Sequence, residues 1–333
     1  MKVTFYFRHP DKLNRSIERV FDFVSFELKN SFRVKVDTVF AKACRIWPLA
    51  MCYNVLRMGF ISRKNGIHHI TGDIHYTSLL MPKNRTVLTV HDLVSIHNSE
   101  LNPMFKRFVY YLWYYYPLKH LKYITCVSEA TKQDLIHYFP FAQNKVTVIP
   151  NPIPDGFTAM KASVNNKPVI LHIGTRSNKN LERVIKALAH LDCHLRIIGR
   201  LTVEQEELLR ETNLDFSNVY GISDEEMVNE YRKCDIISFP SLFEGFGMPI
   251  IEGQACARIV VTSDLEPMKS ISGGASILVN PEDEKSILHG FETALENLQL
   301  RQSLIAKGLE NARKYSINSI AAKYKELYDR IIQ

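Results

Sequence analysis

The sequence lacks the long apolar segments that mark exported or membrane-spanning proteins. Its longest run without Asp, Glu, Lys or Arg has 12 residues, whereas a helix needs about 20 apolar residues to cross a bilayer. Near the N-terminus, Arg8 and Asp11 interrupt the stretch where a secretory signal would need an unbroken apolar core. We therefore expect a cytoplasmic protein without a transmembrane segment.

Signals for disulfides, metals and redox cofactors are also missing. The cysteines form no Cys-x-x-Cys pair and stand mostly among apolar neighbours, which favours reduced thiols in the core. No Asp-x-Asp pair and no group of His and carboxylate residues has the spacing of metal ligands, so we expect neither a metal nor a cofactor. No Gly-x-Gly-x-x-Gly follows an early strand, which argues against a dinucleotide-dependent oxidoreductase. The six cysteines are Cys44, Cys52, Cys126, Cys193, Cys234 and Cys256.

What the sequence does contain is enough apolar material for two ordinary domains. At 333 residues, 46% of them hydrophobic, the chain exceeds the size at which one core usually stays single. Its charge is uneven, because residues 1–150 hold 21 Lys and Arg against 10 Asp and Glu, and residues 151–333 hold 21 against 25. The basic first half suggests an anionic partner, such as a phospholipid surface, a phosphorylated lipid or a nucleic acid.

Short β-branched runs alternate with helical patterns in both halves, which predicts an α/β protein with two doubly wound parallel sheets. The segment NPIPDGF, residues 151–157, is the predicted linker. Ligands of such folds bind beyond the carboxyl ends of the strands, so we expect the site between the two domains. The predicted strands are 3–7, 67–70, 86–90, 123–127, 146–149, 168–174, 195–199, 235–241, 258–263 and 276–280, and the predicted helices of the second half are 180–190, 203–211, 224–232 and one from Pro249.

The stretch FEGFGMPIIE, residues 243–252, follows a predicted buried strand and carries the start signal of a helix. Pro249 suits the first helical position, because its fixed φ and missing N–H cost nothing there. The helix should therefore begin at about Met248, and the free amides of its first turn form a partly positive site in which a phosphate fits.

Two glycines and two glutamates surround this anion site. Gly245 and Gly247 let the backbone approach a ligand closely. Glu244 and Glu252 flank the site, and because carboxylates repel phosphate we expect them to accept hydrogen bonds from hydroxyls such as those of a ribose and a hexose. These residues by themselves leave open that Glu252 only complements the helix dipole and that Glu244 is a solvated loop residue.

A second loop predicts cations at the same sheet edge. In HIGTRSNKNLERV a strand ends at Gly174 and a helix begins near Asn180, so that Arg176 and Lys179 lie at a carboxyl-end loop. Two cations and two helix N-termini would neutralise a diphosphate leaving group without a metal. Taken alone, this loop favours the interpretation of Lys179 as an ordinary exposed lysine.

These residues carry a family resemblance. The chain resembles the retaining GT-B glycosyltransferases of family 4, whose mark is EGFGxPxxE, and the resemblance covers nearly the whole length. One departure is the stretch RHPDKLNRSIERV, residues 8–20, which stands where many members carry a Gly-Gly loop. The supporting matches are VHDL (90–93), CVSEATKQDLIHYF (126–139), VIPNPI (148–153), HIGTRSNKNLERVIKAL (172–188) and CDIISFPSLFEGFGMPIIEG (234–253).

The resemblance implies a GT-B fold with an acceptor-side domain and a nucleotide-sugar domain. A final helix, 317–332, resembles the one that crosses back onto the first domain, which gives domains of 1–155 plus 316–333 and of 156–315. Among the implied roles, Lys179 and Arg176 bind the pyrophosphate, Glu252 binds the ribose, and His91 faces the donor sugar. The implied catalytic residues are Lys179, Arg176, Glu244 and His91. The implied donor-binding residues are Tyr220, Gly221 and Ile222 beside the base, Glu252 at the ribose, Gly245, Phe246, Gly247, Met248 and Pro249 around the sugar and phosphates, and Gly174.

The implied reaction moves a hexosyl unit from UDP-sugar or GDP-sugar to a hydroxyl of a glycan or lipid-linked acceptor, with retention, without a metal, in cell-surface polysaccharide biosynthesis. Two alternatives stay open at this point. A GT-B sugar-nucleotide epimerase has the same fold, and a non-enzymatic binder of anionic polymers would explain the basic half but neither glutamate. We expect no nucleic-acid partner.

The segment 104–123, MFKRFVYYLWYYYPLKHLKY, mixes aromatic and basic residues along a predicted helix interrupted near Pro117. Such a helix either rests on an anionic membrane or packs its rings on the sheet and extends its lysines outward, and the second interpretation is favoured. Peripheral membrane contact through the basic first domain remains a prediction.

Overall fold

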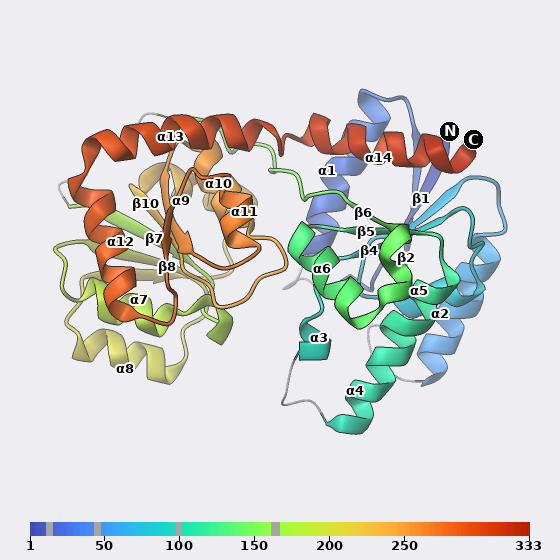
Figure 1. Cartoon of the computed structure of the whole chain (residues 1–333), viewed down its shortest axis with the longest axis horizontal. Helices are drawn as coiled ribbons and strands as arrows, with labels where there is room; N and C mark the ends of the chain where they lie inside the picture. The colour runs from blue at the N-terminus through green and yellow to red at the C-terminus, as the bar shows by residue number, and fades with distance from the viewer. Residues whose placement is uncertain (11–15, 43–47, 98–101, 161–166) are drawn as a thin grey trace. The chain divides into compact units, whose positions relative to one another are not determined.

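The computed structural model describes residues 1–10, 16–42, 48–97, 102–160 and 167–333. The chain divides into two compact units, one of residues 1–152 with 317–333 and one of residues 153–316 (Figure 1). The linker predicted at 151–157 contains the first of these boundaries. Cys44 and residues 11–15 of the loop that departs from the family pattern lie outside the described residues.

Unit 1 is built on a parallel six-stranded sheet in the order β2-β1-β3-β4-β5-β6. Its strands are β1 (Lys2–Phe7), β2 (Lys35–Phe40), β3 (Ile67–Ile70), β4 (Thr86–Val90), β5 (Tyr123–Cys126) and β6 (Val146–Val148). Its helices are α1 (Ser16–Asn30), α2 (Pro48–Ile61), α3 (Val94–His97), α4 (Pro103–Val109), α5 (Tyr116–His120), α6 (Glu129–Tyr138) and α14 (Ile317–Ile332), with the short helical turns η1 (His75–Leu80), η2 (Tyr110–Tyr115) and η3 (Pro140–Lys145).

Helices cover both faces of this sheet. On one face α1 and α14 pack side by side on Val3, Phe5 and Phe7 of β1, as Figure 1 shows above the strands. On the other face Met51 and Met58 of α2 join a core that also includes residues of η1, η2, α5 and α6. The central strands β1, β3, β4 and β5 are buried on both sides, which explains why they read as continuous apolar runs in the sequence.

Unit 2 repeats the plan with the order β12-β11-β10-β7-β8-β9, again entirely parallel. Its strands are β7 (Val169–Ile173), β8 (His194–Ile198), β9 (Phe216–Val219), β10 (Ile236–Phe239), β11 (Ile259–Ser263) and β12 (Ile277–Val279). Its helices are α7 (Leu181–Leu188), α8 (Val203–Glu211), α9 (Asp224–Lys233), α10 (Met248–Ala255), α11 (Met268–Ser272), α12 (Glu284–Glu296) and α13 (Leu298–Arg313), with the turn η4 (Ser177–Lys179).

The predicted fold class is confirmed, since two parallel sheets carry flanking helices. The strands that sequence reasoning missed are β2 and β9, and each is an edge strand of its sheet. Their side chains are half-buried or exposed, so that neither forms the apolar run by which the buried strands were recognised.

The aromatic segment 104–123 is not interrupted at Pro117. Pro117 lies in the first turn of α5, where it is tolerated, and a π-helical turn, η2, joins α4 to α5. Tyr114 is buried, and Trp113 packs against the same core. The favoured interpretation, in which the rings pack on the sheet, is therefore the one that the structure bears out.

Candidate active site

Two loops of unit 2 that the sequence predicts to hold the donor are tied together by hydrogen bonds. One follows β7 and the other follows β10. The amide of Leu242 donates to the carbonyl of Asn178 at 2.8 Å, and the Asn178 side chain donates to the carbonyl of Phe243 at 3.0 Å. Asn180, buried in a left-handed conformation before α7, donates to the carbonyl of Pro240 at 3.0 Å. Residues 60 or more positions apart thus form one rigid sheet end.

Lys179 lies at the centre of this arrangement. Its aliphatic stem crosses Gly174, where φ is +95° and a Cβ would lie 2.8 Å from Cγ of Lys179. Its ammonium lies 4.8 Å from the ring centroid of buried Phe239 and donates to Oε1 of Glu244 at 2.6 Å. Asn178 donates to the same oxygen at 3.3 Å. The predicted catalytic lysine and glutamate are therefore direct partners rather than neighbours on opposite sides of an anion.

The helix predicted to begin at about Met248 does begin there. Gly247 precedes it with φ of +110°, and a Cβ at that position would lie 3.0 Å from Cδ1 of Ile250. A side chain there would be both strained and crowded, which explains the glycine. Pro249 is the second helical residue instead of the first, and it is still within the turn where its missing N–H is tolerated.

Glu252 lies one turn inside α10 and has a partner that the sequence did not indicate. Only 8% of Glu252 is exposed, and Oε2 accepts a hydrogen bond of 2.5 Å from the hydroxyl of buried Tyr231 in α9. Burial, together with the charge of Glu252, raises the pKa of Tyr231 well above its usual range, so the phenol stays protonated and donates. The carboxylate is held in one orientation, which a merely solvated glutamate near a helix start would not be.

The remaining predicted residues of unit 2 lie along the same sheet edge. Arg176 is exposed on the loop of Lys179. Tyr220 follows β9, is 58% exposed, and has the guanidinium carbon of Arg200 5.1 Å from its ring centroid. Gly221 has φ of +70° with open space where a Cβ would stand, and Ile222 is half-buried. The rest of the motif after β10 is Gly245, half-buried, and Phe246, which is buried against the ring of Tyr315.

A buried, neutral histidine, His172, lies in the strand that leads to the loop of Lys179. It is fully buried on β7, and its Nδ1 lies 3.1 Å from Oγ of Ser238 on β10. Burial, with the Lys179 ammonium nearby, lowers the pKa of His172 to about 3. The imidazole is therefore neutral at physiological pH, and the positive charge at this sheet end belongs to the loop above it.

His91 of unit 1 follows β4, as predicted. Its Nε2 lies 2.7 Å from the carbonyl oxygen of Thr71. Because a carbonyl only accepts, Nε2 carries the proton, and in the neutral ring Nδ1 is then an acceptor. Gly72 makes room for the ring, since a Cβ there would lie 2.8 Å from Cδ2 of His91. The backbone after β3 thus fixes the tautomer and the position of His91.

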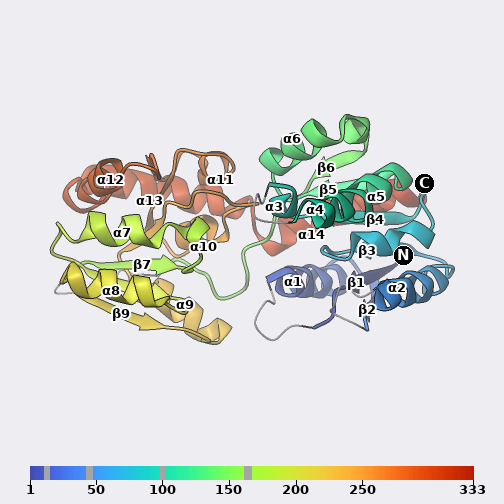
Figure 2. The ribbon, with the colours of Figure 1, turned by 90° about the horizontal axis from the view of Figure 1, so that it is seen from below.

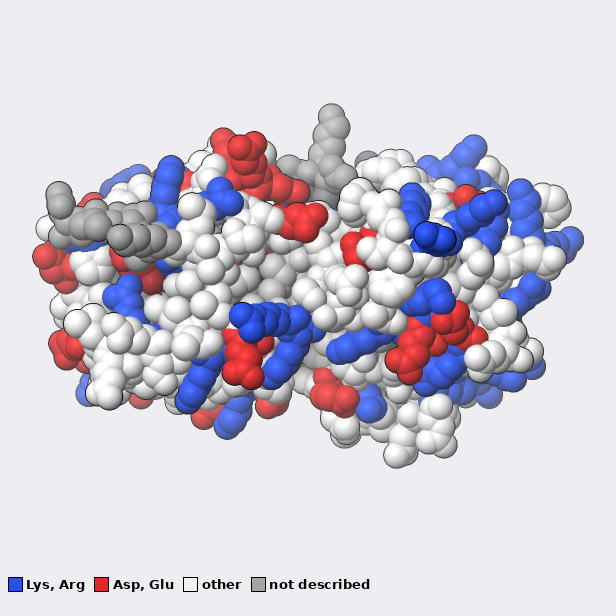
Figure 3. All heavy atoms as spheres, turned by 90° about the horizontal axis from the view of Figure 1, so that it is seen from above, with Lys and Arg blue, Asp and Glu red and all other residues white. Residues whose placement is uncertain are grey.

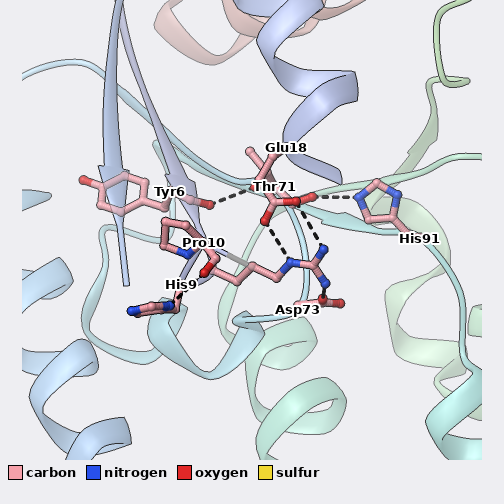
Figure 4. A network of polar contacts seen from close by, with 8 residues as sticks. Tyr6, His9, Pro10, Glu18, Thr71, Asp73 and His91 are labelled. Atoms are coloured by element: carbon pink, nitrogen blue, oxygen red, sulfur yellow. Dashed lines mark hydrogen bonds and ion pairs between the residues drawn. The ribbon is translucent and has the colours of Figure 1, made fainter. Parts of the chain in front are cut away.

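A network of charged residues lies next to His91 (Figure 4). Arg8, which follows β1, donates through Nε to Oε1 of Glu18 on α1 at 2.8 Å and also pairs with Asp73 after β3. The side chain of Glu18 is 6% exposed, whereas that of Asp73 is 48% exposed. Trp113 of η2 donates to the backbone carbonyl of Asp73 at 2.5 Å. This end of the sheet thus carries an anchored cation and a partly exposed carboxylate.

Sequence reasoning missed Arg8, Asp73 and Tyr231 as members of these sites. The signal available for Arg8 was its place directly after the first strand of a parallel sheet, and Asp73 has the same place after β3. Tyr231 had no signal in the sequence, because it comes from a helix that precedes β10 and reaches Glu252 only through packing.

Three further features of the described residues concern thiols, groups of metal-ligating side chains and helix length. Among them Cys126, Cys193, Cys234 and Cys256 are buried free thiols, and Cys52 is an exposed one. No three His, Cys, Asp or Glu side chains in the described ranges are grouped as for a metal ion. Within the same ranges, no helix is long and apolar enough to cross a membrane.

A solved glycosyltransferase structure from Rickettsia africae has the same architecture, with a TM-score of 0.78 over 100% of this chain and 99% of that chain at 18% identity. The structure of Anabaena Alr3699/HepE in complex with UDP and glucose superimposes with a TM-score of 0.78 over 98% of this chain and 99% of that chain, at 14% identity. The fold is that of the GT-B glycosyltransferases.

Sequence comparison gives the family. The model of "Glycosyl transferases group 1" matches residues 158–311, and that of "Glycosyltransferase Family 4" matches residues 43–156. The serotype-specific mannosyltransferase WbdA of Escherichia coli is 25% identical over 75% of this chain, which spans about a third of its length (34%). An N-acetylgalactosaminyltransferase of Campylobacter jejuni that acts on a diphospho-undecaprenol-linked sugar is 28% identical over 58% of this chain and 56% of its own. The chain belongs to the family of GT-B glycosyltransferases of the family 4 type.

Proposed function

We propose that this chain transfers a hexosyl unit from a UDP-sugar or GDP-sugar to a hydroxyl of a lipid-linked or growing glycan in cell-surface polysaccharide biosynthesis. The relatives named above act in mannosyl transfer and on a diphospho-undecaprenol-linked acceptor, and one structural neighbour holds UDP and glucose. Since the chain spans only part of the mannosyltransferase, the sugar and the acceptor belong to this proposal.

The observation that carries the proposal is the Lys179–Glu244 pair beside the N-terminus of α10. An ammonium has three donors, and the contact with Glu244 uses one of them. A diphosphate placed at the first turn of α10 would receive a second donor from Lys179 and would lie at the positive end of the helix dipole. Glu244 then turns its other oxygen to a hydroxyl of the sugar, since a carboxylate repels phosphate.

Glu252 completes the donor site in this proposal. Tyr231 holds its carboxylate in one orientation, so that a ribose hydroxyl meets a fixed acceptor instead of a mobile one. Preorganisation of this kind lowers the cost of ordering side chains on binding. Arg176, exposed on the loop of Lys179, adds charge on the pyrophosphate side.

Catalysis follows from where charge develops. As the glycosidic bond breaks, negative charge grows on the departing phosphate, and donors aimed at that oxygen stabilise the transition state more than the ground state. We propose that Lys179 and the α10 amides supply this stabilisation without a metal. We also propose retention by a front-face route, in which the leaving phosphate helps to deprotonate the acceptor hydroxyl.

The test combines nucleotide binding with one substitution. UDP, GDP and ADP are compared in thermal-shift measurements, and the nucleotide that binds is then offered as its sugar, with release of nucleotide in water as an acceptor-independent activity. Lys179→Ala should lower kcat about 100-fold or more, because one such donor is worth about 3 kcal/mol, and should weaken nucleotide binding far less.

The matched control is Lys186→Ala, which removes a lysine from the outer part of α7, where Lys186 pairs with Glu284 at 3.3 Å. This variant should turn over normally. Near-normal turnover of Lys179→Ala, or no thermal shift with any nucleotide, would remove the proposed donor site.

A further inference from the structure

The outward face of α2 is apolar. Leu49, Tyr53, Leu56 and Phe60 are 83%, 48%, 64% and 70% exposed, respectively. Their spacing of four, three and four residues places them in one stripe along a helix. A surface helix of a water-soluble protein normally turns polar residues outward, so α2 is apolar on both of its sides.

The orientation of α2 is fixed by its inner side, so this stripe does not simply turn inward. Met51 and Met58 are buried in the unit 1 core. Asn54 accepts a hydrogen bond from the amide of Lys42 at 3.1 Å. At Gly59, a Cβ would lie 2.8 Å from Cβ of Leu80, so η1 packs directly against the helix backbone.

Basic residues accompany the stripe, and acidic residues are absent from this part of the sequence. No Asp or Glu occurs between Asp37 and Asp73. Exposed Arg63 has its guanidinium carbon 5.8 Å from the ring centroid of Phe60, and Lys64 follows it. Arg57 donates to the carbonyl of Phe40 at the end of β2, the edge at which Figure 2 shows α2.

The whole of unit 1 carries the same sign of charge. Its residues, 1–152 and 317–333, include 24 Lys and Arg against 12 Asp and Glu. On the face drawn in Figure 3, Lys and Arg side chains are spread over unit 1, at the right. A long-range attraction to anionic surfaces follows from this excess, and it weakens with salt.

We propose that α2 docks unit 1 on a membrane rich in anionic lipids, with Leu49, Tyr53, Leu56 and Phe60 in the interface and the neighbouring basic residues on the headgroups. An apolar stripe with aromatic and basic flanks is the pattern of helices that lie in the bilayer interface. At 14 residues α2 is about 21 Å long, too short to span the hydrocarbon core of about 30 Å. A symmetric dimer through the same face would bring two basic surfaces together, which charge repulsion disfavours.

The docking element differs from the one that the sequence suggested. The aromatic segment 104–123 turns rings such as Tyr114 into the core, whereas α2 exposes the rings of Tyr53 and Phe60. Arg57 is the one charged residue of α2. The proposal does not depend on the donor or on the reaction, because it rests on unit 1 residues outside the proposed donor site.

Vesicle flotation tests it. The full chain is mixed with vesicles of phosphatidylcholine alone or of phosphatidylcholine with phosphatidylglycerol, at low and high salt. We expect the protein to float with the anionic vesicles and to be released as salt rises. The variant L56S/F60S should bind at least about tenfold more weakly, because it removes two large apolar groups from the interface.

Two further variants separate the apolar from the electrostatic contribution. V203S/L298S changes two equally exposed apolar residues of unit 2, 68% and 66% exposed, and should float like the parent protein. R63E/K64E should lose binding to anionic vesicles most strongly at low salt. All variants should keep the nucleotide-induced thermal shift, which shows that they are folded and keeps this test apart from that of the donor site.

Three results would overturn the proposal. One is a parent protein that stays with the unbound fraction at low salt in the presence of anionic vesicles. Another is L56S/F60S floating as well as the parent. The third is a dimer in light scattering that L56S/F60S converts to a monomer, which would assign the stripe to contact between copies of the chain.

Discussion

At the residue scale, the arrangement around Lys179 and Glu252 has one principle in common. Each charged group is held by a neighbour that is not itself a predicted ligand contact: Phe239 lies under the Lys179 ammonium, and Tyr231 donates to Glu252. A charge with a fixed position costs less to order when the ligand arrives. The supporting residues are therefore as informative about the site as the residues of the motif.

Tyr231→Phe tests the support of Glu252. Removal of the hydroxyl takes one hydrogen-bond donor away from the buried carboxylate of Glu252, which should lower the free energy of unfolding by about 1–3 kcal/mol and weaken nucleotide binding several-fold. Denaturant unfolding and calorimetric titration with the nucleotide measure the two effects.

Tyr6→Phe is the matched control, because the hydroxyl of Tyr6 lies 3.1 Å from Nδ1 of His68 in the core of unit 1. It should cost stability and leave the nucleotide affinity unchanged. If Tyr231→Phe bound nucleotide as tightly as the parent chain, the orientation of Glu252 would have no role in binding.

At the element scale, the loop after β7 shows how a glycine positions a functional side chain. Gly174 and Gly274 both have positive φ, +95° and +69°. A Cβ at Gly174 would collide with the stem of Lys179, whereas a Cβ at Gly274 would meet nothing within 4 Å. Alanine at either glycine would strain the backbone, but only alanine at position 174 would also displace Lys179. A comparison of the two variants therefore separates the two effects.

Gly174→Ala should therefore lower both stability and activity. The strain of a left-handed alanine costs about 1–2 kcal/mol in either variant, but only Gly174→Ala should also displace Lys179 and lower kcat. Thermal unfolding and nucleotide release are measured for both variants. Equal kcat values for Gly174→Ala and Gly274→Ala would mean that the lysine reaches its position without the glycine.

Elements of this chain were predictable where the signal is local. The buried strands, α8, the start of α10 and the span of α14 follow from apolar runs, helix periodicity and Pro249. The contacts within the site could not be predicted in this way, because they join residues far apart in the sequence. Lys179 and Glu244 are 65 positions apart, and so are Arg8 and Asp73. Sequence places both members of each pair at a strand end, but side-chain packing decides whether they touch.

At the scale of the whole molecule, buried uncharged histidines are unevenly divided between the units. Burial lowers the pKa of His69 and His172 to about 3 and that of His68 and His75 to about 4. Of these, only His172 belongs to unit 2. His69 joins β3 to α14 and β4, with its ring nitrogens 2.6 Å from the Tyr328 hydroxyl and 2.7 Å from Oγ1 of Thr89.

This division predicts that unit 1 is the acid-sensitive part of the protein. An unfolded histidine has a pKa of about 6.5, so the unfolded chain binds protons that the folded units exclude. The stability contributed by each neutral histidine is complete above pH 6.5 and is lost as the pH falls toward the folded values. At pH 5.5 each of these histidines lowers the free energy of unfolding by about 1.4 kcal/mol. Three of them lie in unit 1 and one in unit 2.

Hydrogen exchange followed by mass spectrometry reads both units in the same sample, so that unit 2 serves as the internal control. Between pH 7 and pH 5.5, after correction for intrinsic exchange rates, protection of β3, β4 and α14 should fall more than that of β7, β10 and β11. His69→Gln should reduce the difference, because glutamine keeps a donor and an acceptor but takes up no proton. Both units carry carboxylates on their helices. An equal loss of protection in both units would therefore show that carboxylates, and not these histidines, govern the response to acid.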